Sequence, residues 1–387
     1  MRPLTPVRLR IEKDVVIRIH RRLKGKGKFN ISVGQEVIPS DIIGSAQVAS
    51  GFRTLNLSHL LGVKPDEVEK YLKRPLGQRI YKDELLAFKS GGLLGGKKFV
   101  TSPTDGILDF LSSKTGELRM MFLPKKADLP AGVYGIVEKI DEEKGQAIIR
   151  TQVSIIHGVA GSGRIRDGRL HVISKRDELI GKYYIFPKQD EEILVGGSLI
   201  FKDALSAAIS AGVNGVIIGG LNAKDYRGIA GGRLVFPKKL ENDIGISVVV
   251  CEGFGAIPLG EDIYKLLLNY DGKFVSIDGN ISKVFLPAFD SSVIRKVKNC
   301  KLPPLSEDAT YIDERLDQFI DLKVNSKVRV VGNSYPGVQG KVVSLDQTET
   351  LLPSGIKAFL AIVETSKQKM KVPVANLEIM CGVDYSS

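Results

Sequence analysis

The sequence predicts a multi-domain, β-rich protein of the α+β class. First, its 387 residues exceed what one hydrophobic core usually holds, so several domains are expected. Second, most of the chain consists of short runs of alternating apolar and polar residues between glycine, proline and aspartate turns, which is typical of strands. Third, residues 186–286 alternate nearly continuous apolar strands with helices, which indicates a small parallel α/β domain.

Composition favours a folded protein outside the membrane. Hydrophobic residues make up 43% of the chain, which is typical of globular proteins. No apolar run approaches the ~20 residues of a membrane helix, and the first residues lack an apolar signal core. We therefore expect a cytoplasmic protein with no membrane insertion. The three cysteines and four histidines are scattered, so we expect no disulfide framework, no metal site and no cofactor.

The charge is strongly basic and uneven. The formal net charge is +12, and ten of the basic residues lie within residues 2–28. A further eight lie within residues 323–371. Basic clusters of this kind attract polyanions by counterion release, so nucleic acid is a predicted partner. The alternative is a solvated basic surface without a ligand, as is common in heat-adapted proteins.

An internal repeat marks the N-terminal third. Residues 33–44 and residues 76–87 share a Gly-Gln turn, a strand, a polar turn and an apolar strand. Residues 58–72 between them read as a short helical insertion with Pro65 in a first turn. The second copy continues into Ser-Pro-Thr-Asp-Gly-Ile at residues 102–107. Glycine at such turns supplies the positive φ that a small folded-over sheet requires.

This pattern resembles the barrel-sandwich hybrid of biotinyl and lipoyl domains and of several large assemblies. Carrier domains of that kind hold a modified lysine in the turn between the two halves. The matching turn here, residues 101–106, has no lysine. The resemblance therefore implies a scaffold domain over residues 1–125 and not a swinging arm.

Residues 126–185 form a predicted β-rich segment without a functional interpretation. Two strands over residues 133–140 and 146–153 are joined by a polar turn, and Asp167-Gly168 predicts a hairpin within residues 164–172. The glycine-rich run at residues 158–163 does not open a helix, so it lacks the context of a dinucleotide-binding loop.

The α/β domain offers the candidate small-ligand site. Helices are expected over residues 202–211, near Ala223 and over residues 261–268. Glycine-rich turns follow three of its strands, and the carboxyl ends of parallel strands meet at one edge where ligands bind. The candidate ligand-binding residues are Gly197, Ser198, Gly219, Gly220, Asn222, Gly253 and Gly255. The competing interpretation is that these glycines only shape the turns.

Catalytic motifs are missing from the sequence. It contains no Walker-type loop, no Gly-x-Gly-x-x-Gly and no nucleophile elbow. Cys251 and Glu252 would lie at the same edge of the sheet, but a cysteine that ends an apolar strand is more often buried than reactive. We name no catalytic residue and expect a binding protein, although the sequence leaves enzymatic activity undecided.

A linker over residues 287–321 precedes a second small β domain over residues 322–387. Two alternating strands flank Tyr335, Pro336 and Gly337, a combination that predicts a tight turn. Gly340 allows close packing of the second strand against the first. Later strands are expected over residues 358–363 and 369–372.

This hairpin resembles the KOW motif of NusG-type transcription factors and ribosomal proteins. The resemblance covers residues 322–387 and implies a small five-stranded barrel whose loop contacts RNA or protein. An aromatic ring in the loop can stack on a base, and basic side chains can meet phosphates. The candidate residues for nucleic-acid or partner binding are Lys327, Arg329, Tyr335, Gln339 and Lys341.

The sequence thus predicts a non-catalytic scaffold that docks on a transcription or translation complex, or on RNA, through this last domain. RNA, a ribonucleoprotein or RNA polymerase is the expected partner. The alternative is a small-ligand-binding or redox-associated protein that uses the glycine-rich edge; the order of its domains is similar to that in NqrA and RnfC relatives, without their flavin or iron–sulfur signatures. No feature indicates an oligomeric state.

Overall fold

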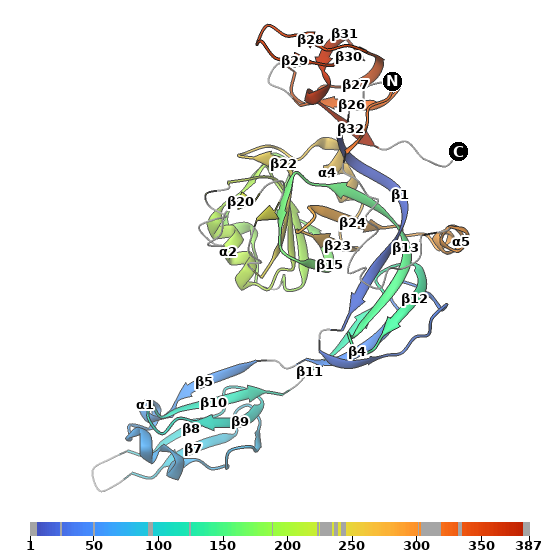
Figure 1. Cartoon of the computed structure of the whole chain (residues 1–387). Coiled ribbons are helices and arrows are strands. Elements are labelled where there is room, and N and C mark those ends of the chain that lie inside the picture. The colour runs from blue at the N-terminus through green and yellow to red at the C-terminus, as the bar shows by residue number, and fades with distance from the viewer. Residues whose placement is uncertain are drawn as a thin grey trace.

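The computed structural model is a β-rich α+β structure with several sheets. It describes residues 6–23, 25–48, 51–91, 96–123, 125–187, 189–222, 224, 234–235, 239–240, 245–300, 302, 319–331 and 335–381. Four units follow one another in space, with an inserted lobe at one end and a C-terminal β unit at the other (Figure 1). Among the described helices, none is long and apolar enough to cross a membrane.

We call the unit next to the inserted lobe the proximal β unit. It consists of the N-terminal strand and of further strands that precede and follow that lobe in the sequence. Its strands are β1 (Pro6–Arg22), β2 (Lys26–Phe29), β3 (Glu36–Val37), β4 (Ile42–Val48), β11 (Lys125–Pro130), β12 (Gly135–Asp141) and β13 (Gln146–His157). β1 and β13 are antiparallel over ten residue pairs, and β12 pairs with the other edge of β13. The core of this unit contains Ile17, Val37, Ile43, Val137 and Ile149.

The inserted lobe lies between β4 and β11. Its elements are β5 (Phe52–Asn56), α1 (Leu57–Leu61), the 3₁₀ helix η1 (Pro65–Tyr71), β6 (Arg79–Ile80), β7 (Leu85–Lys89), β8 (Lys98–Thr101), β9 (Gly106–Leu111) and β10 (Glu117–Phe122). One sheet has the order β5-β10-β9-β6, and β7 and β8 form a second. The predicted helical insertion is confirmed, with Pro65 in the first turn of η1.

The internal repeat is confirmed as local structure. Gly34 and Gly77 have φ of 87° and 85° at equivalent turns. In the first copy the Asp41 carboxylate accepts a hydrogen bond from the backbone N–H of Ile38, and in the second Glu84 accepts one from Tyr81. We expected both copies in one domain over residues 1–125. They instead contribute to separate cores, the first to the proximal β unit and the second to the inserted lobe.

The α/β unit follows β13. Its elements are β14 (Ala160–Ser162), β15 (Ile165–Val172), β16 (Leu179–Ile180), the 3₁₀ helix η2 (Lys182–Tyr184), β17 (Glu192–Gly196), β18 (Leu199–Ile200), α2 (Lys202–Ser210), β19 (Gly215–Leu221), β20 (Leu234–Val235), β21 (Lys239–Leu240), β22 (Ser247–Phe254), α4 (Glu261–Leu268), β23 (Phe274–Asp278) and β24 (Lys283–Pro287). β15, β17, β19 and β22 are parallel neighbours, as predicted for the last three. The predicted helix near Ala223 lies outside the described residues.

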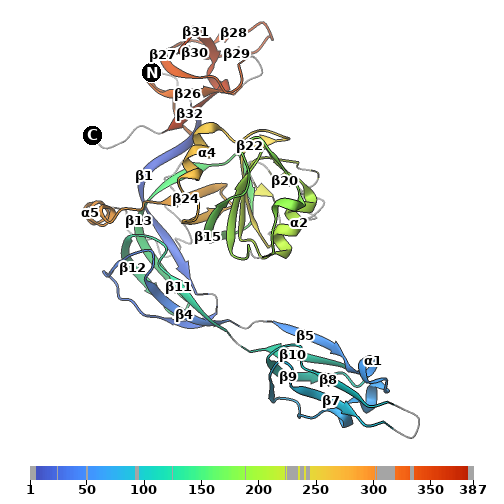
Figure 2. The same ribbon diagram turned by 180° about the vertical axis from the view of Figure 1, so that it is seen from behind.

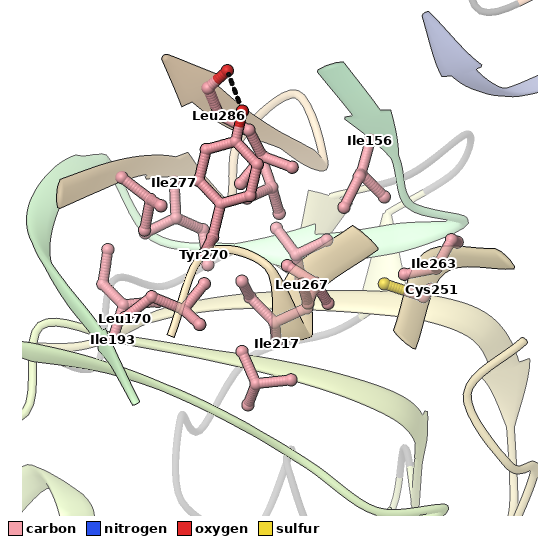
Figure 3. Packing of buried hydrophobic residues seen from close by; sticks show 14 of the residues in the cluster. Ile156, Leu170, Ile193, Ile217, Cys251, Ile263, Leu267, Tyr270, Ile277 and Leu286 are labelled. Carbon is pink, nitrogen blue, oxygen red and sulfur yellow. Dashed lines mark hydrogen bonds between the residues drawn. The ribbon is translucent and has the colours of Figure 1, made fainter. Parts of the chain in front are cut away.

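Two apolar layers sandwich this parallel sheet. α2 contributes Ala204 and Leu205 to one layer. α4 contributes Ile263 and Leu267 to the other, which Figure 3 shows with the sulfur of Cys251 among buried aliphatic side chains. The i, i+4 spacing of Ile263 and Leu267 places both on the helix face that covers the sheet. Both helices were predicted from this local pattern.

The predicted hairpin at Asp167-Gly168 is wrong. β15 runs straight through both residues, which pair with Ser276 and Val275 of β23. The Asp167 carboxylate forms an ion pair with Arg21 of β1. A methyl group on Gly168 would collide with the backbone of Glu191. The two residues therefore serve contacts distant in sequence, and β14 to β16 join the α/β unit although we placed residues 126–185 in a separate segment.

The C-terminal β unit completes the chain. Its elements are β25 (Phe319–Asp321), β26 (Lys327–Val330), β27 (Gln339–Leu345), β28 (Thr350–Leu351), β29 (Lys357–Ala358), β30 (Leu360–Glu364), β31 (Lys369–Pro373), the 3₁₀ helix η3 (Val374–Asn376) and β32 (Leu377–Cys381). The predicted linker over residues 287–321 contains a helix, α5 (Ser292–Asn299), whose Val293 and Val297 pack on Ile136 of β12. Most of the remaining linker lies outside the described residues.

β1 connects three of the four units. Its first residues, Val7 and Leu9, lie in the core of the C-terminal β unit, where β1 pairs with β25 and β32. Ile11 lies in the core of the α/β unit, and Ile17 lies in that of the proximal β unit. A bulge at Asp14, with φ of 58°, separates the last two. The view from behind shows the same strand running from the C-terminal β unit into the proximal one (Figure 2).

Candidate nucleic-acid interface

The β26–β27 hairpin brings the five predicted binding residues into one part of the C-terminal β unit. Lys327 lies opposite Lys341, and Arg329 lies opposite Gln339. Alternation along the strands places these four side chains on one face, because successive residues point to opposite sides. The intervening valines, Val328, Val330 and Val342, are buried in the core of the unit.

The turn of the hairpin carries Tyr335. Gly337 has φ of 79°, and its backbone N–H donates to the carbonyl of Val330 over 2.8 Å. This conformation suits glycine, as the sequence predicted. The turn is thus tied to β26, and the Tyr335 side chain remains 48% exposed. A half-exposed ring held on a fixed turn can offer a flat face to a ligand.

Gly340 packs closely against a different strand from the one that the sequence predicted. A methyl group at this position would lie 2.6 Å from the carbonyl oxygen of Glu364 in β30. Glycine is therefore required for close approach to β30, not to β26. Sequence adjacency favoured the hairpin partner, whereas the other edge of β27 sets the constraint.

The two lysines of the hairpin are exposed and directly opposed. Neither Lys327 nor Lys341 forms an ion pair within the described part of the chain. Like charges directly opposite each other on neighbouring strands repel and destabilise the pair. An anion bound between them would remove this repulsion.

Arg329 belongs to a different environment. Its side chain is only 14% exposed, and Nη2 lies 2.6 Å from Glu252 and 3.0 Å from Glu378. Arg329 therefore contacts the α/β unit from within the molecule. Of the five candidates, it is the one that the fold already provides with anionic partners.

Arg329 is part of a charge cluster that sequence reasoning missed. We call it the arginine cluster. It comprises three arginines, one of them fully buried, and three carboxylates. Its members are Arg8, Arg10, Glu252, Asp262, Arg329 and Glu378.

Arg10 lies at the centre of the arginine cluster. Its guanidinium is 2.9 Å from Glu252, 2.9 Å from Asp262 and 3.0 Å from Glu378. These carboxylates come from β22, α4 and β32, so the arginine cluster joins the α/β unit to the C-terminal β unit. In the sequence, Arg8 and Arg10 stand out only as members of the basic run over residues 2–28, which gives no indication of their acidic partners.

The buried arginines also change the interpretation of the N-terminal charge. Arg8, Arg10 and Arg21 are all buried, and each has a carboxylate partner. Arg18 is paired with Glu138. Much of the basic run over residues 2–28 therefore serves internal contacts and does not form a cationic surface.

The predicted glycine-rich segments meet at the carboxyl edge of the parallel sheet, but Gly219 and Gly220 lie within β19 and Gly253 lies within β22, not in turns after these strands. The backbone N–H of Gly219 donates to the carbonyl of Gly197 over 3.2 Å. A methyl group on Gly220 would collide with the carbonyl of Gly255, and one on Gly219 with that of Ile257. The chain segment after β22 thus lies directly on the end of β19, where the glycines permit backbone-to-backbone packing.

The polar residues of this edge have internal partners. The hydroxyl of Ser198 donates to the carbonyl of Asp177 over 3.1 Å, and the Asn222 side chain accepts from the N–H of Lys224. Gly253, near the end of β22, has a positive φ of 155°. The arrangement of the edge is explained by packing alone.

Cys251 and Glu252 have structural surroundings. Cys251 is fully buried, and burial raises the pKa of its thiol to about 12, so the nucleophilic thiolate is disfavoured. The Glu252 carboxylate is bound by Arg10 and Arg329. Within the described ranges, no group of three His, Cys, Asp or Glu side chains is placed to hold a metal ion.

No protein-family model matches the chain, and no curated protein matches it significantly.

Proposed function

We propose that this chain is a non-catalytic binding protein that docks on RNA or on a ribonucleoprotein, such as a transcription or translation complex, through the β26–β27 hairpin. The observation that carries the proposal is the unneutralised lysine pair, Lys327 and Lys341, beside the half-exposed ring of Tyr335. Phosphates would bind between the lysines, and a base would stack on the tyrosine.

Ion pairs within the chain neutralise several charges of the other basic regions. The N-terminal arginines are mostly buried in ion pairs, and Lys369 and Lys371 of the same unit pair with Glu364 and Asp346. Lys327 and Lys341 keep their charge available for a polyanion, whose binding releases counterions. Two lysines give a modest affinity by themselves, which suits a docking contact within a larger complex.

The finer fold assignments belong to the same proposal. The tight turn, the paired strands β26, β27, β30 and β31, and the docking of β32 support a KOW-like barrel. The recurrence of one turn-strand-turn-strand unit in two cores supports a barrel-sandwich-like character of the proximal β unit and of the inserted lobe. We propose a cytoplasmic location on the composition alone.

Salt-dependent RNA binding tests the function. We expect the double variant Lys327→Gln/Lys341→Gln to bind single-stranded RNA more weakly than the wild type. Because each phosphate contact contributes about 0.7 to the log–log salt slope on single strands, that slope should decrease by roughly 1.4. Fluorescence anisotropy at several salt concentrations measures both quantities.

A matched control lies in the same unit. Lys357 and Lys367 are exposed lysines of the β28–β29 hairpin and of the turn before β31. Lys357→Gln/Lys367→Gln removes the same charge and should leave the slope unchanged. Equal losses in both double variants would show that net charge and not the hairpin decides binding, and no loss in either would contradict the proposal.

A further inference from the structure

The outer edge of β5 is unpaired in the sheet of the inserted lobe. β5 lies at the end of the order β5-β10-β9-β6, and among the described residues no strand lies on its other side. An edge strand presents free N–H and C=O groups that can pair with another chain. Two other edge strands are protected: β6 has only two residues, and β2 carries exposed lysines at Lys26 and Lys28.

Hydrogen bonds at both ends of β5 show which backbone groups face this edge. The N–H of Leu57 donates to the carbonyl of Gly116, and the N–H of Phe122 donates to the carbonyl of Gly51. In an antiparallel pair, hydrogen-bonded positions alternate along each strand. The odd-numbered residues of β5 are therefore bonded to β10. The N–H and C=O groups of Phe52 and Thr54 and the N–H of Asn56 point outward, whereas the C=O of Asn56 accepts the first hydrogen bond of α1 as its N-cap carbonyl.

The same three residues lie on an exposed apolar face of the sheet. Phe52 is 61% exposed and lies opposite Met121 of β10, which is also exposed. Phe110 of β9, 52% exposed, continues this face next to Arg119. An added strand would extend the sheet and cover part of this apolar surface.

We propose that β5 pairs with β5 of a second copy of this chain, antiparallel and across a two-fold axis at Thr54. Thr54 then lies opposite Thr54 of the second copy, and Phe52 lies opposite its Asn56. In this register the free groups of Thr54 bond to those of the other Thr54, and the free N–H of Asn56 bonds to the free C=O of Phe52 in the second copy. The pairing joins two four-stranded sheets into one of eight strands and is isologous, as in most protein dimers.

The residue pairs of this register are compatible. Threonine opposite threonine is a favourable cross-strand pair. The only charged residue of β5, Arg53, lies opposite Leu55 of the second copy and not opposite another arginine. A second copy therefore fits the edge without like charges in contact. The contact area is small, so a weak dimer with a Kd on the order of 10 µM is expected.

Charge substitutions at Thr54 test the two-fold axis. The side chain is exposed, so Thr54→Lys and Thr54→Glu should both fold. Each places like charges directly opposite each other at the axis and should weaken the dimer at least ~10-fold. An equimolar mixture of the two variants places opposite charges there and should restore dimers. The control is Thr54→Val, which keeps a β-branched side chain and should dimerise like the wild type.

Sedimentation equilibrium of the full chain, without nucleic acid, gives the result. The wild type should approach twice the chain mass of 42.2 kDa as its concentration rises from ~1 µM to ~500 µM. A wild type that stays monomeric would overturn the proposal and leave the edge to a strand from another protein. Dimers that are unaffected by both charged variants, or a mixture that does not restore them, would also overturn it.

Discussion

Three arginines and three carboxylates meet where the C-terminal β unit contacts the α/β unit. Arg10 is fully buried there, with Glu252 and Asp262 each 2.9 Å away. A buried charge is tolerated only when it is paired and hydrogen-bonded, and removing one partner leaves another charge uncompensated. The arginine cluster therefore fixes the orientation of β26, the strand that carries Lys327.

Replacing one carboxylate of the arginine cluster should destabilise the fold. Glu252→Gln leaves Arg10 and Arg329 partly unpaired in a buried site, so we expect a loss of about 3–5 kcal/mol in the free energy of unfolding. Urea denaturation measures this loss. The control is Glu261→Gln, the same substitution at an exposed i, i+4 pair with Lys265, which should change stability little. Equal effects at both sites would refute the structural role of the arginine cluster.

The same carboxylate should contribute a pH dependence. Burial alone would raise the pKa of Glu252, but the hydrogen bonds and charges of Arg10 and Arg329 outweigh burial and lower it from 4.5 to about 2. A group with a lowered folded-state pKa contributes stability that is complete above the unfolded pKa and is lost as the pH falls toward the folded one.

We therefore expect the stability difference between wild type and Glu252→Gln to shrink as the pH falls from 4.5 toward 2. Urea denaturation of both proteins across this interval measures the difference. The pKa of Asp262 is lowered as well, but this residue is present in both proteins, so its contribution largely cancels. A difference that is constant with pH would show that Glu252 does not titrate in this way.

At the scale of single elements, local pattern was sufficient for some helices and for one hairpin, but it missed α5 in the predicted linker. α4 (Glu261–Leu268) and the β26–β27 hairpin follow from helix periodicity and from the Pro336-Gly337 turn, both of which act within a few residues. Asp167-Gly168 has the same local chemistry as a hairpin turn but lies inside β15. Contacts with Arg21 and with the backbone of Glu191 decide its structure, and these residues are distant in sequence.

Local sequence pattern likewise predicted only part of the candidate nucleic-acid interface. Lys327 and Lys341 are exposed on the hairpin because strand alternation determines their direction, and Tyr335 is half-exposed in the turn between the two strands. Arg329 follows the same alternation, but its side chain is mostly buried because it pairs with Glu252 and Glu378 from other elements. No local signal distinguishes an arginine that faces solvent from one that crosses to another unit.

At the scale of the whole molecule, β1 links the C-terminal, α/β and proximal units, whereas the inserted lobe has its own core. Ile17→Ala in β1 should cost about 2–5 kcal/mol and speed hydrogen exchange in β13 and β32. β9 and β10 of the inserted lobe should keep their protection. The reciprocal control, Leu118→Ala, removes a buried side chain of the inserted lobe and should affect β9 and β10 alone. Loss of protection in all units with either variant would contradict this division.

The central claim is that the β26–β27 hairpin contacts RNA. Ultraviolet crosslinking of the full-length protein to single-stranded RNA, followed by mass spectrometry of the crosslinked peptides, tests it most directly. We expect a crosslink at Tyr335 or at a neighbouring residue of the hairpin, reduced in Lys327→Gln/Lys341→Gln. Crosslinks found only in other units, or none with RNA that is demonstrably bound, would contradict it.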